Sequence, residues 1–172
     1  KASRSEKIIF FFLISLAIFS LSSFFLIKNK CLFVKNYNPE KLSFDKPNNI
    51  VILNVDCGNV IIELYPNISP NAVERFKTLV RSKAYDDIAF HRVIKDSLVQ
   101  AGDLEFGKKG NIDYGKIGTG QSGLGTINSE VDVPFNYERG SVGLARTQKY
   151  NTEDSQFFIT LKDEPLYESE YT

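Results

Sequence analysis

Three short blocks carry most of the structural information in this sequence: Phe90-His91-Arg92-Val93-Ile94, Val99-Gln100-Ala101-Gly102-Asp103 and Ser155-Gln156-Phe157-Phe158-Ile159-Thr160. Each block is rich in apolar residues, and glycine or charged residues stand close to its ends. Short apolar runs bounded by such residues are typical of strands in a sheet. The first two blocks therefore predict strands over residues 88–94 and 97–101.

The residues around these blocks predict a hairpin, one helix and further strands. Apolar and polar residues alternate over 50–64, and Gly58-Asn59 within this stretch is a turn signal. Ser69-Pro70 predicts the start of a helix, with serine as the N-cap and proline at the first helical position. Short apolar runs over 141–145 and 156–161 complete a chain that we expect to consist mostly of short strands.

Length, charge and composition exclude several classes of protein. The chain has 172 residues, and its 21 basic and 21 acidic residues cancel. This length favours one domain, and a neutral chain lacks the basic patch of a nucleic-acid-binding protein. One histidine and two cysteines exclude both a zinc site built from several such ligands and a dense disulfide framework. The 42% hydrophobic share is too high for a disordered chain.

Residues 8–27 form an uncharged run whose only polar members are four serines. A helix of this length spans about 30 Å, the hydrocarbon thickness of a bilayer. A cleaved signal peptide normally has a shorter apolar core followed by a small-x-small site, which this sequence lacks. We therefore expect an uncleaved single-pass anchor at 8–27, between a basic tail (1–7) and a stalk (28–48). Basic residues flank the run on both sides, so its orientation stays open.

The two cysteines lie in different predicted segments. Cys31 is in the stalk and Cys57 is next to the predicted hairpin turn. A disulfide between them would stabilise the folded chain by about 3 kcal/mol in the chain-entropy model. Nothing in the sequence requires this pairing, so both states stay open.

Three motifs that suggest other chemistry fail on their context. Residues 118–123 match the dinucleotide pattern G-x-G-x-x-G, but the residues after them cannot open the helix that it requires. Residues 102–109 imitate a P-loop, with lysine at the position of the magnesium-binding serine or threonine. His91 is interpreted as a hydrogen-bonded core residue. A hydrolytic triad with Ser155 is disfavoured because no Gly-x-Ser-x-Gly elbow occurs.

In their order and spacing, the three blocks resemble the cyclophilin family of peptidyl-prolyl cis–trans isomerases. Residues 140–147 are also similar to the segment that precedes Ser-Gln-Phe-Phe in bacterial cyclophilins. The resemblance covers residues 49–172 and implies one mainly β domain, a closed antiparallel barrel of eight strands with a flanking helix. The family continues with further elements beyond the position of Thr172, and the chain begins at Lys1 without a methionine. We therefore expect the natural protein to be longer, with the barrel incomplete here.

The resemblance implies an enzyme that accelerates X–Pro bond rotation in unfolded or exported proteins, without metal or cofactor. A guanidinium can stabilise a twisted amide at any physiological pH, and the match assigns this role to Arg92. The residues that would contact or support the peptide are Leu98, Gln100, Gly120, Ala145, Arg146, Gln156, Phe158, Leu166 and Tyr171. The implied partners are proline-containing polypeptides and the membrane, with no nucleic acid. We expect a monomeric domain outside the cytoplasm, as in a bacterial periplasm.

Two positions depart from the family's usual pattern. Ser97 stands where a phenylalanine commonly forms a pocket wall, and Leu166 falls near a position that is often tryptophan. A shallower pocket follows, and we do not expect tight binding of cyclosporin-type drugs. The second hypothesis is therefore a non-catalytic chaperone or assembly module that binds proline-containing segments on the same fold. A lipocalin-like ligand carrier has only the strand content in its favour.

Overall fold

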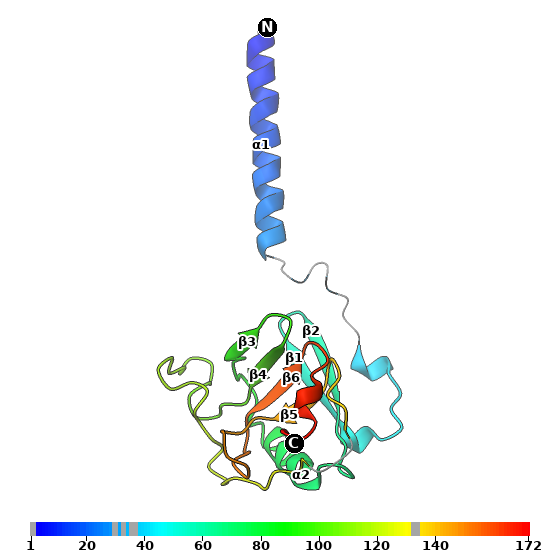
Figure 1. The fold of residues 1–172 in the computed structure, drawn as a ribbon. Helices are drawn as coiled ribbons and strands as arrows, with labels where there is room; N and C mark the ends of the chain where they lie inside the picture. The colour runs from blue at the N-terminus through cyan, green and yellow to red at the C-terminus, as the bar shows by residue number, and fades with distance from the viewer. Residues whose placement is uncertain (1–2, 29–30, 32–33, 35–37, 132–134) are drawn as a thin grey trace. The chain divides into compact units, whose positions relative to one another are not determined.

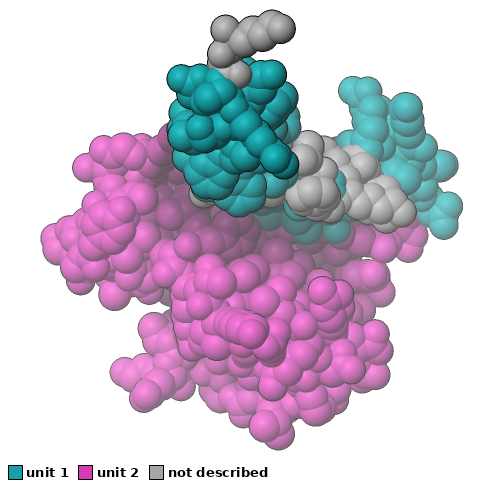
Figure 2. Space-filling view, turned by 90° about the horizontal axis from the view of Figure 1, so that it is seen from above, with its two compact units in different colours: residues 1–45, 52–61 teal, residues 46–51, 62–172 magenta. Residues whose placement is uncertain are grey.

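The computed structural model describes residues 3–28, 31, 34, 38–131 and 135–172. The chain divides into two compact units, which Figure 2 colours separately: Lys1–Asp45 with Ile52–Ile61, and Lys46–Val51 with Ile62–Thr172. Most of the hairpin that the sequence predicts groups with the N-terminal segment in this division.

The first unit begins with helix α1, Arg4–Lys28, which contains the whole apolar run (Figure 1). None of its described residues is buried, and the side chains of Phe12 and Phe19 are 67% and 71% exposed. Among the described residues, this is the one helix long and apolar enough to cross a membrane. Exposure of so many apolar side chains is unfavourable in water.

A two-stranded sheet follows, formed by β1, Ile50–Val55, and β2, Gly58–Glu63. Its turn lies at Asp56–Cys57 rather than at the predicted Gly58-Asn59, because Gly58 is already the first residue of β2. Two short 3-10 helices precede this sheet, η1 at Pro39–Lys41 and η2 at Pro47–Asn49.

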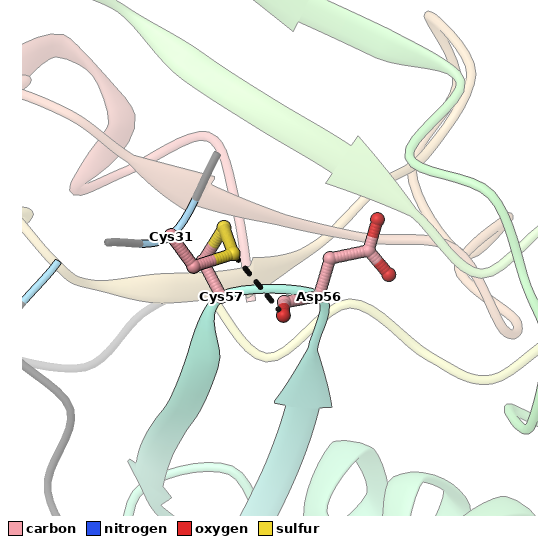
Figure 3. The surroundings of a disulfide bond; sticks show 3 residues. All are labelled: Cys31, Asp56 and Cys57. Carbon is pink, nitrogen blue, oxygen red and sulfur yellow. Dashed lines mark hydrogen bonds between the residues drawn. A yellow bond between two sulfur atoms is a disulfide. The ribbon is translucent and has the colours of Figure 1, made fainter. Parts of the chain in front are cut away.

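A disulfide joins Cys31 to Cys57 at the turn of the hairpin (Figure 3). Their Cα atoms are 4.9 Å apart, and the Cys31 Sγ lies 3.4 Å from the carbonyl oxygen of Asp56. The pairing that the sequence leaves open is therefore present in the structure, within the first unit.

Helix α2, Pro70–Arg81, begins at the predicted proline, but its N-terminus is capped from a distant part of the chain. The Ser69 side chain makes no cap hydrogen bond. The Glu130 carboxylate instead accepts from the backbone N–H groups of Asn71 and Ala72, each at 3.0 Å. A carboxylate at this end satisfies N–H groups without partners inside the helix and interacts favourably with its dipole. Ser69 thus occupies the predicted N-cap position, but a distant carboxylate supplies the hydrogen bonds that its side chain was expected to make.

The second unit contains a four-stranded antiparallel sheet in the order β3-β4-β6-β5 (Figure 1). Its strands are β3 at Arg92–Ile94, β4 at Leu98–Ala101, β5 at Val142–Leu144 and β6 at Phe157–Thr160. All four lie within the predicted runs and are shorter than predicted. The described residues thus form sheets of two and four strands, and they do not show the closed eight-stranded barrel that the resemblance implies.

The two phenylalanines at the start of β6 separate two packed regions, because successive residues of a strand point to opposite faces. Phe157 packs against Phe76 of α2 and against Tyr85, with ring centroids 5.3 and 5.5 Å apart. This side of the sheet is the core under α2. Phe158 packs on the other side, with Leu98 and Tyr137.

Removal of the Glu130 carboxylate should destabilise the protein, whereas removal of the Ser69 hydroxyl should not. In Glu130→Ala two backbone N–H groups of α2 lose their acceptor, so we expect the free energy of unfolding to fall by about 1–2 kcal/mol. Ser69→Ala should change it by less than about 0.5 kcal/mol. Urea unfolding of the full chain in detergent, followed by circular dichroism, measures both. Equal losses in the two variants would contradict the cap.

The cysteines should resist alkylation until a reductant is added, because disulfide sulfurs do not react with iodoacetamide. Full-length chain purified without reductant and unfolded in urea should take up no label at Cys31 or Cys57. The same sample should take up two labels after reduction, and intact-mass spectrometry counts them. Two labels without reduction would show that the thiols are free.

Candidate active site

One cross-strand row of the sheet places Arg92 beside the apolar cluster. Arg92 pairs with Gln100 across β3 and β4, and Gln100 pairs with Phe158 across β4 and β6. Residues directly opposite each other in antiparallel strands project to the same face. The three side chains therefore emerge together, although the chain brings them from separate blocks. All of β3 is exposed, so the Arg92 side chain is accessible to a ligand.

A series of side-chain hydrogen bonds connects Arg92 to the glycine-rich loop, residues 107–125. Arg92 Nη1 donates to Gln100 Oε1 at 3.3 Å, and Gln100 Nε2 donates to Gln156 Oε1 at 2.9 Å. Gln156 Nε2 donates to the carbonyl oxygens of Gly118 at 3.0 Å and Gly120 at 2.9 Å. Gln156 and Gly120, both predicted site residues, thus reach Arg92 through Gln100.

The buried carboxylate of Asp103 organises the backbone of this loop. Its Oδ1 accepts from the N–H groups of Glu105 (3.1 Å) and Phe106 (2.8 Å). Its Oδ2 accepts from those of Gly118 (2.7 Å) and Gly120 (3.0 Å). Burial raises the pKa of Asp103, but the four N–H donors together outweigh burial and hold its pKa below the ordinary value. A Cβ at Gly120 would collide with this carboxylate, so only glycine fits.

The apolar part of the site is an aromatic cluster centred on Phe158. Leu98, Tyr137 and Phe158 are its buried members. The ring of Tyr171 lies edge-on to Phe158 with centroids 5.0 Å apart, and that of Tyr167 does so at 5.7 Å. Such edge-to-face pairs are favourable. The partly buried residues packed against the cluster are Phe135, Ala145, Tyr167 and Tyr171.

Arg146 is engaged by the C-terminal segment of the chain. Its side chain is 7% exposed. Nε donates to the carbonyl oxygen of Glu170 at 2.8 Å, and Nη2 donates to its carboxylate at 2.6 Å. The guanidinium also lies 4.2 Å from the ring centroid of Tyr150 and 5.2 Å from that of Tyr171. The side chain therefore holds Tyr171 in place, and the backbone of Arg146 remains the part that the match relates to the peptide.

One predicted contact residue, Leu166, lies outside the cluster. Two residues that were not predicted, Tyr167 and Tyr137, lie in it. Leu166 is 81% exposed, whereas its neighbour Tyr167 packs in the cluster. Both lie in the 3-10 helix η3, Pro165–Tyr167, where adjacent side chains project in different directions. Tyr137 is the second missed residue. The alternation of Phe135 and Tyr137 is a signal that could have identified it.

His91 lies next to the glycine-rich loop but not in the hydrogen-bond series. Neither ring nitrogen has a hydrogen-bond partner within the described residues. Burial lowers the pKa of His91, more than the nearby charge of Asp103 raises it. Within the described residues, His91 therefore lacks the hydrogen-bond partner that the sequence led us to expect. Among the described residues, no group of three His, Cys, Asp or Glu side chains could hold a metal ion.

Comparisons with known sequences point to one family. The family model described as cyclophilin type peptidyl-prolyl cis-trans isomerase/CLD matches residues 50–172. A probable peptidyl-prolyl cis-trans isomerase of Brucella suis is 43% identical over 129 residues, 73% of this chain and 64% of that protein. The peptidyl-prolyl cis-trans isomerase ppi1 of Schizosaccharomyces pombe is 32% identical over 127 residues, covering 71% and 74%. The chain thus spans less than two thirds of the Brucella relative.

Two crystal structures resemble the fold. A Cryptosporidium parvum cyclophilin type peptidyl-prolyl cis-trans isomerase, solved in the presence of the dipeptide ala-pro, has a TM-score of 0.57 and 29% identity. The match covers 67% of this chain and 69% of that one. The cyclophilin AquaCyp293 from Hirschia baltica has a TM-score of 0.60 at 21% identity, covering 80% and 69%, and supports the fold alone. Since the family model includes both sheets and every residue of the Arg92 hydrogen-bond series, the chain belongs to the cyclophilin-type peptidyl-prolyl cis–trans isomerase family.

Proposed function

We propose that this chain catalyses the cis–trans isomerisation of X–Pro bonds in unfolded or exported polypeptides, with Arg92 as the catalytic residue. The observation that carries the proposal is an exposed guanidinium held by Gln100 beside the Phe158 cluster. A charged donor next to apolar surface suits a ligand with a polar backbone and a proline ring. The names of the relatives support the same reaction.

The chemistry requires only a fixed donor. Amide resonance opposes rotation of a peptide bond by about 18–20 kcal/mol. No bond breaks during rotation, and the nitrogen of the twisted amide regains a lone pair that can accept a hydrogen bond. Arg92 would stabilise this state more than the planar amide, which lowers the barrier. Arginine remains protonated throughout the physiological range, so the donor is always available.

The neighbouring residues would hold the peptide on both sides of the rotating bond. Gln100 presents its amide on the same face as Arg92. Leu98 and Phe158 are the buried apolar residues on that face, and we assign the proline ring to the cluster that they form with their partly buried neighbours. Backbone groups at Ala145 and Arg146 would bind the peptide chain, with Tyr171 packed against Phe158 at the edge.

A non-catalytic binding module is the second candidate, and one feature of the rim favours it. Ser97 Oγ donates to the Glu164 carboxylate at 3.3 Å, where the family commonly has an aromatic wall. The exposed Leu166 adds no wall either. With a polar residue at 97 and an exposed one at 166, the site would bind the proline ring more weakly. Weak binding is compatible with a protein that binds many polypeptides without catalysing isomerisation.

We further propose that residues 8–27 anchor the protein as a single-pass membrane protein, with the isomerase domain outside the cytoplasm. Helix α1 has the length and the exposed apolar surface for this role. The Cys31–Cys57 disulfide supports the extracytoplasmic side, because disulfides persist in oxidising compartments and are rare in the cytosol.

Replacement of Arg92 should reduce turnover far more than peptide binding. Arg92→Ala removes a charged donor worth about 10²–10³ in rate in a site that excludes water, and this exposed site should lie near the lower value. Arg92→Lys should recover only part of the rate, since an ammonium lacks the planar fork. Arg81→Ala is the matched control, an exposed arginine at the end of α2. Protease-coupled isomerisation of the full chain in detergent gives the rates.

Peptide affinity separates the two candidate functions. Titration of a proline peptide should give dissociation constants within about threefold for wild type and Arg92→Ala. If Arg92→Ala keeps more than about a third of the wild-type rate, Arg92 is not the catalytic residue. A wild-type chain that binds the peptide without accelerating isomerisation would identify the binding module instead.

The isomerisation rate should be independent of pH between about 6 and 8. His91 lies outside the hydrogen-bond series and burial lowers its pKa, while an arginine side chain stays protonated throughout this window. No group of the proposed site then changes charge. Rates measured in buffers of constant ionic strength test this expectation. A bell-shaped profile centred near pH 6.5 would instead assign acid–base chemistry to His91.

A further inference from the structure

We propose that Asp103 is a positioning residue of the isomerase site: through the glycine-rich loop it fixes the orientation of the Gln156 and Gln100 amides, so that the Gln100 oxygen faces Arg92. The inference rests on the proposed function, since it concerns how the proposed catalytic guanidinium is held. It goes beyond that function because Asp103 is fully buried, so a bound peptide would not reach it, and because it was not among the predicted site residues.

The first step is the fixed backbone of the loop. Asp103 is fully buried, and a carboxylate can only accept hydrogen bonds. Its Oδ2 holds the N–H groups of Gly118 and Gly120 at 2.7 and 3.0 Å. A single oxygen thereby fixes the backbone at two glycines that lie close together in an irregular loop. The carbonyl groups of the same two glycines, which belong to the peptide groups that follow, both accept from the side chain of Gln156.

The second step is the direction of the glutamine bonds. The carbonyl oxygens of Gly118 and Gly120 can only accept, so the group of Gln156 that faces them must be its NH₂. Gln156 Oε1 then faces Gln100 and must accept a hydrogen bond, which the Gln100 NH₂ donates at 2.9 Å. The oxygen of Gln100 is left for Arg92, whose guanidinium can only donate.

This series has only one arrangement without a conflict. A flip of either glutamine amide would place two donors or two acceptors face to face, which is unfavourable where water is partly excluded. Since an acceptor-only group begins the series and a donor-only group ends it, the two glutamines cannot reverse together either. Asp103 and Arg92 therefore belong to one coupled unit, joined through the loop carbonyls.

The exposed position of Arg92 explains why its guanidinium needs a fixed acceptor. The whole of β3 is exposed, so close packing does not restrict the long arginine side chain. A donor that must meet a lone pair present only in the twisted amide has to keep its direction before the peptide rotates. The Gln100 oxygen supplies a fixed acceptor at 3.3 Å, and its own orientation depends on Gln156 and on the loop.

The competing explanation is that Asp103 merely stabilises the loop. In Asp103→Asn one carboxylate oxygen becomes an NH₂, which cannot accept from two of the four N–H groups, so some loss of stability is expected in either case. The two explanations differ in how the variant combines with Gln156→Leu, which removes the link to Gln100. A positioning role acts through Gln156, whereas a purely structural role acts independently of it.

The experiment is a double-mutant cycle on the full chain in detergent, with isomerisation kinetics as the readout. We expect Asp103→Asn and Gln156→Leu each to lower kcat about tenfold with KM within twofold, since the lost effect belongs to the transition state. The double variant should lie within about twofold of the lower single variant. Asp113→Asn is the matched control: its carboxylate binds the Gly115 N–H at 2.9 Å in the same loop but is 44% exposed. It should keep the wild-type kcat within twofold.

One further variant keeps the proposal falsifiable if Asp103→Asn does not fold. Gln156→Glu leaves Asp103 intact and can still accept from Gln100, but a carboxylate cannot donate to the loop carbonyls. It should lower kcat as much as Gln156→Leu. A wild-type kcat in Gln156→Glu, or losses that multiply to about a hundredfold in the double variant, would overturn the proposal.

Nuclear magnetic resonance separates this proposal from the proposed function. In the wild type, the side-chain NH₂ protons of Gln156 and Gln100 should exchange slowly with water, and Asp103→Asn should remove the protection of both. Asp113→Asn should leave it unchanged. This readout needs no enzymatic activity: an inactive wild type with coupled amide signals would reject the isomerase function alone. Unchanged signals in folded Asp103→Asn would reject the positioning role alone.

Discussion

The antiparallel pairing of β4 with both of its neighbours is the constraint on which the rest of the site depends. This pairing places Gln100 opposite Arg92 on one side and opposite Phe158 on the other. A shift of one residue would turn every side chain of β4 to the other face of the sheet. Leu98 and Ala101 oppose such a shift, because both are buried although they project to opposite faces. The register is therefore specified from both sides.

In the long loop beside this sheet, side-chain carboxylates accept backbone hydrogen bonds that a neighbouring strand would accept in a sheet. Buried backbone N–H groups need acceptors, and the loop forms no strand ladder to supply them. Asp103 serves Gly118 and Gly120, and Asp154 accepts from the N–H and hydroxyl of Ser122. Asp154 is in turn paired with Arg75 of α2. A buried carboxylate is costly unless hydrogen-bonded or paired, and both of these meet that condition.

The N-terminal unit has a different physical basis, because a disulfide rather than a core joins its parts. Helix α1 ends at Lys28, and Cys31 lies three residues further along the chain. The covalent path from α1 to the hairpin turn therefore consists of three residues and one disulfide, instead of the whole stalk. Apolar burial contributes little here, since α1 has no buried residue among those described. Packing within the described chain therefore does not stabilise α1.

The resemblance of three sequence blocks to the cyclophilin family implied Arg92, Gln100 and Phe158 as site residues. Local patterns in the sequence determined the strands, the start of α2 and the apolar run of α1. These features depend on residues within a few positions of one another, where periodicity and turn chemistry act. Tertiary structure alone decided that the Glu130 carboxylate rather than the Ser69 hydroxyl caps α2, because Glu130 lies 59 positions from Asn71, from whose N–H it accepts. It also decided that Tyr167 rather than Leu166 enters the cluster, that Cys31 meets Cys57, and that Asp103 reaches two glycines of the loop. Each of these contacts joins groups whose distance is fixed only in the folded chain, so no pattern of neighbouring residues predicts them.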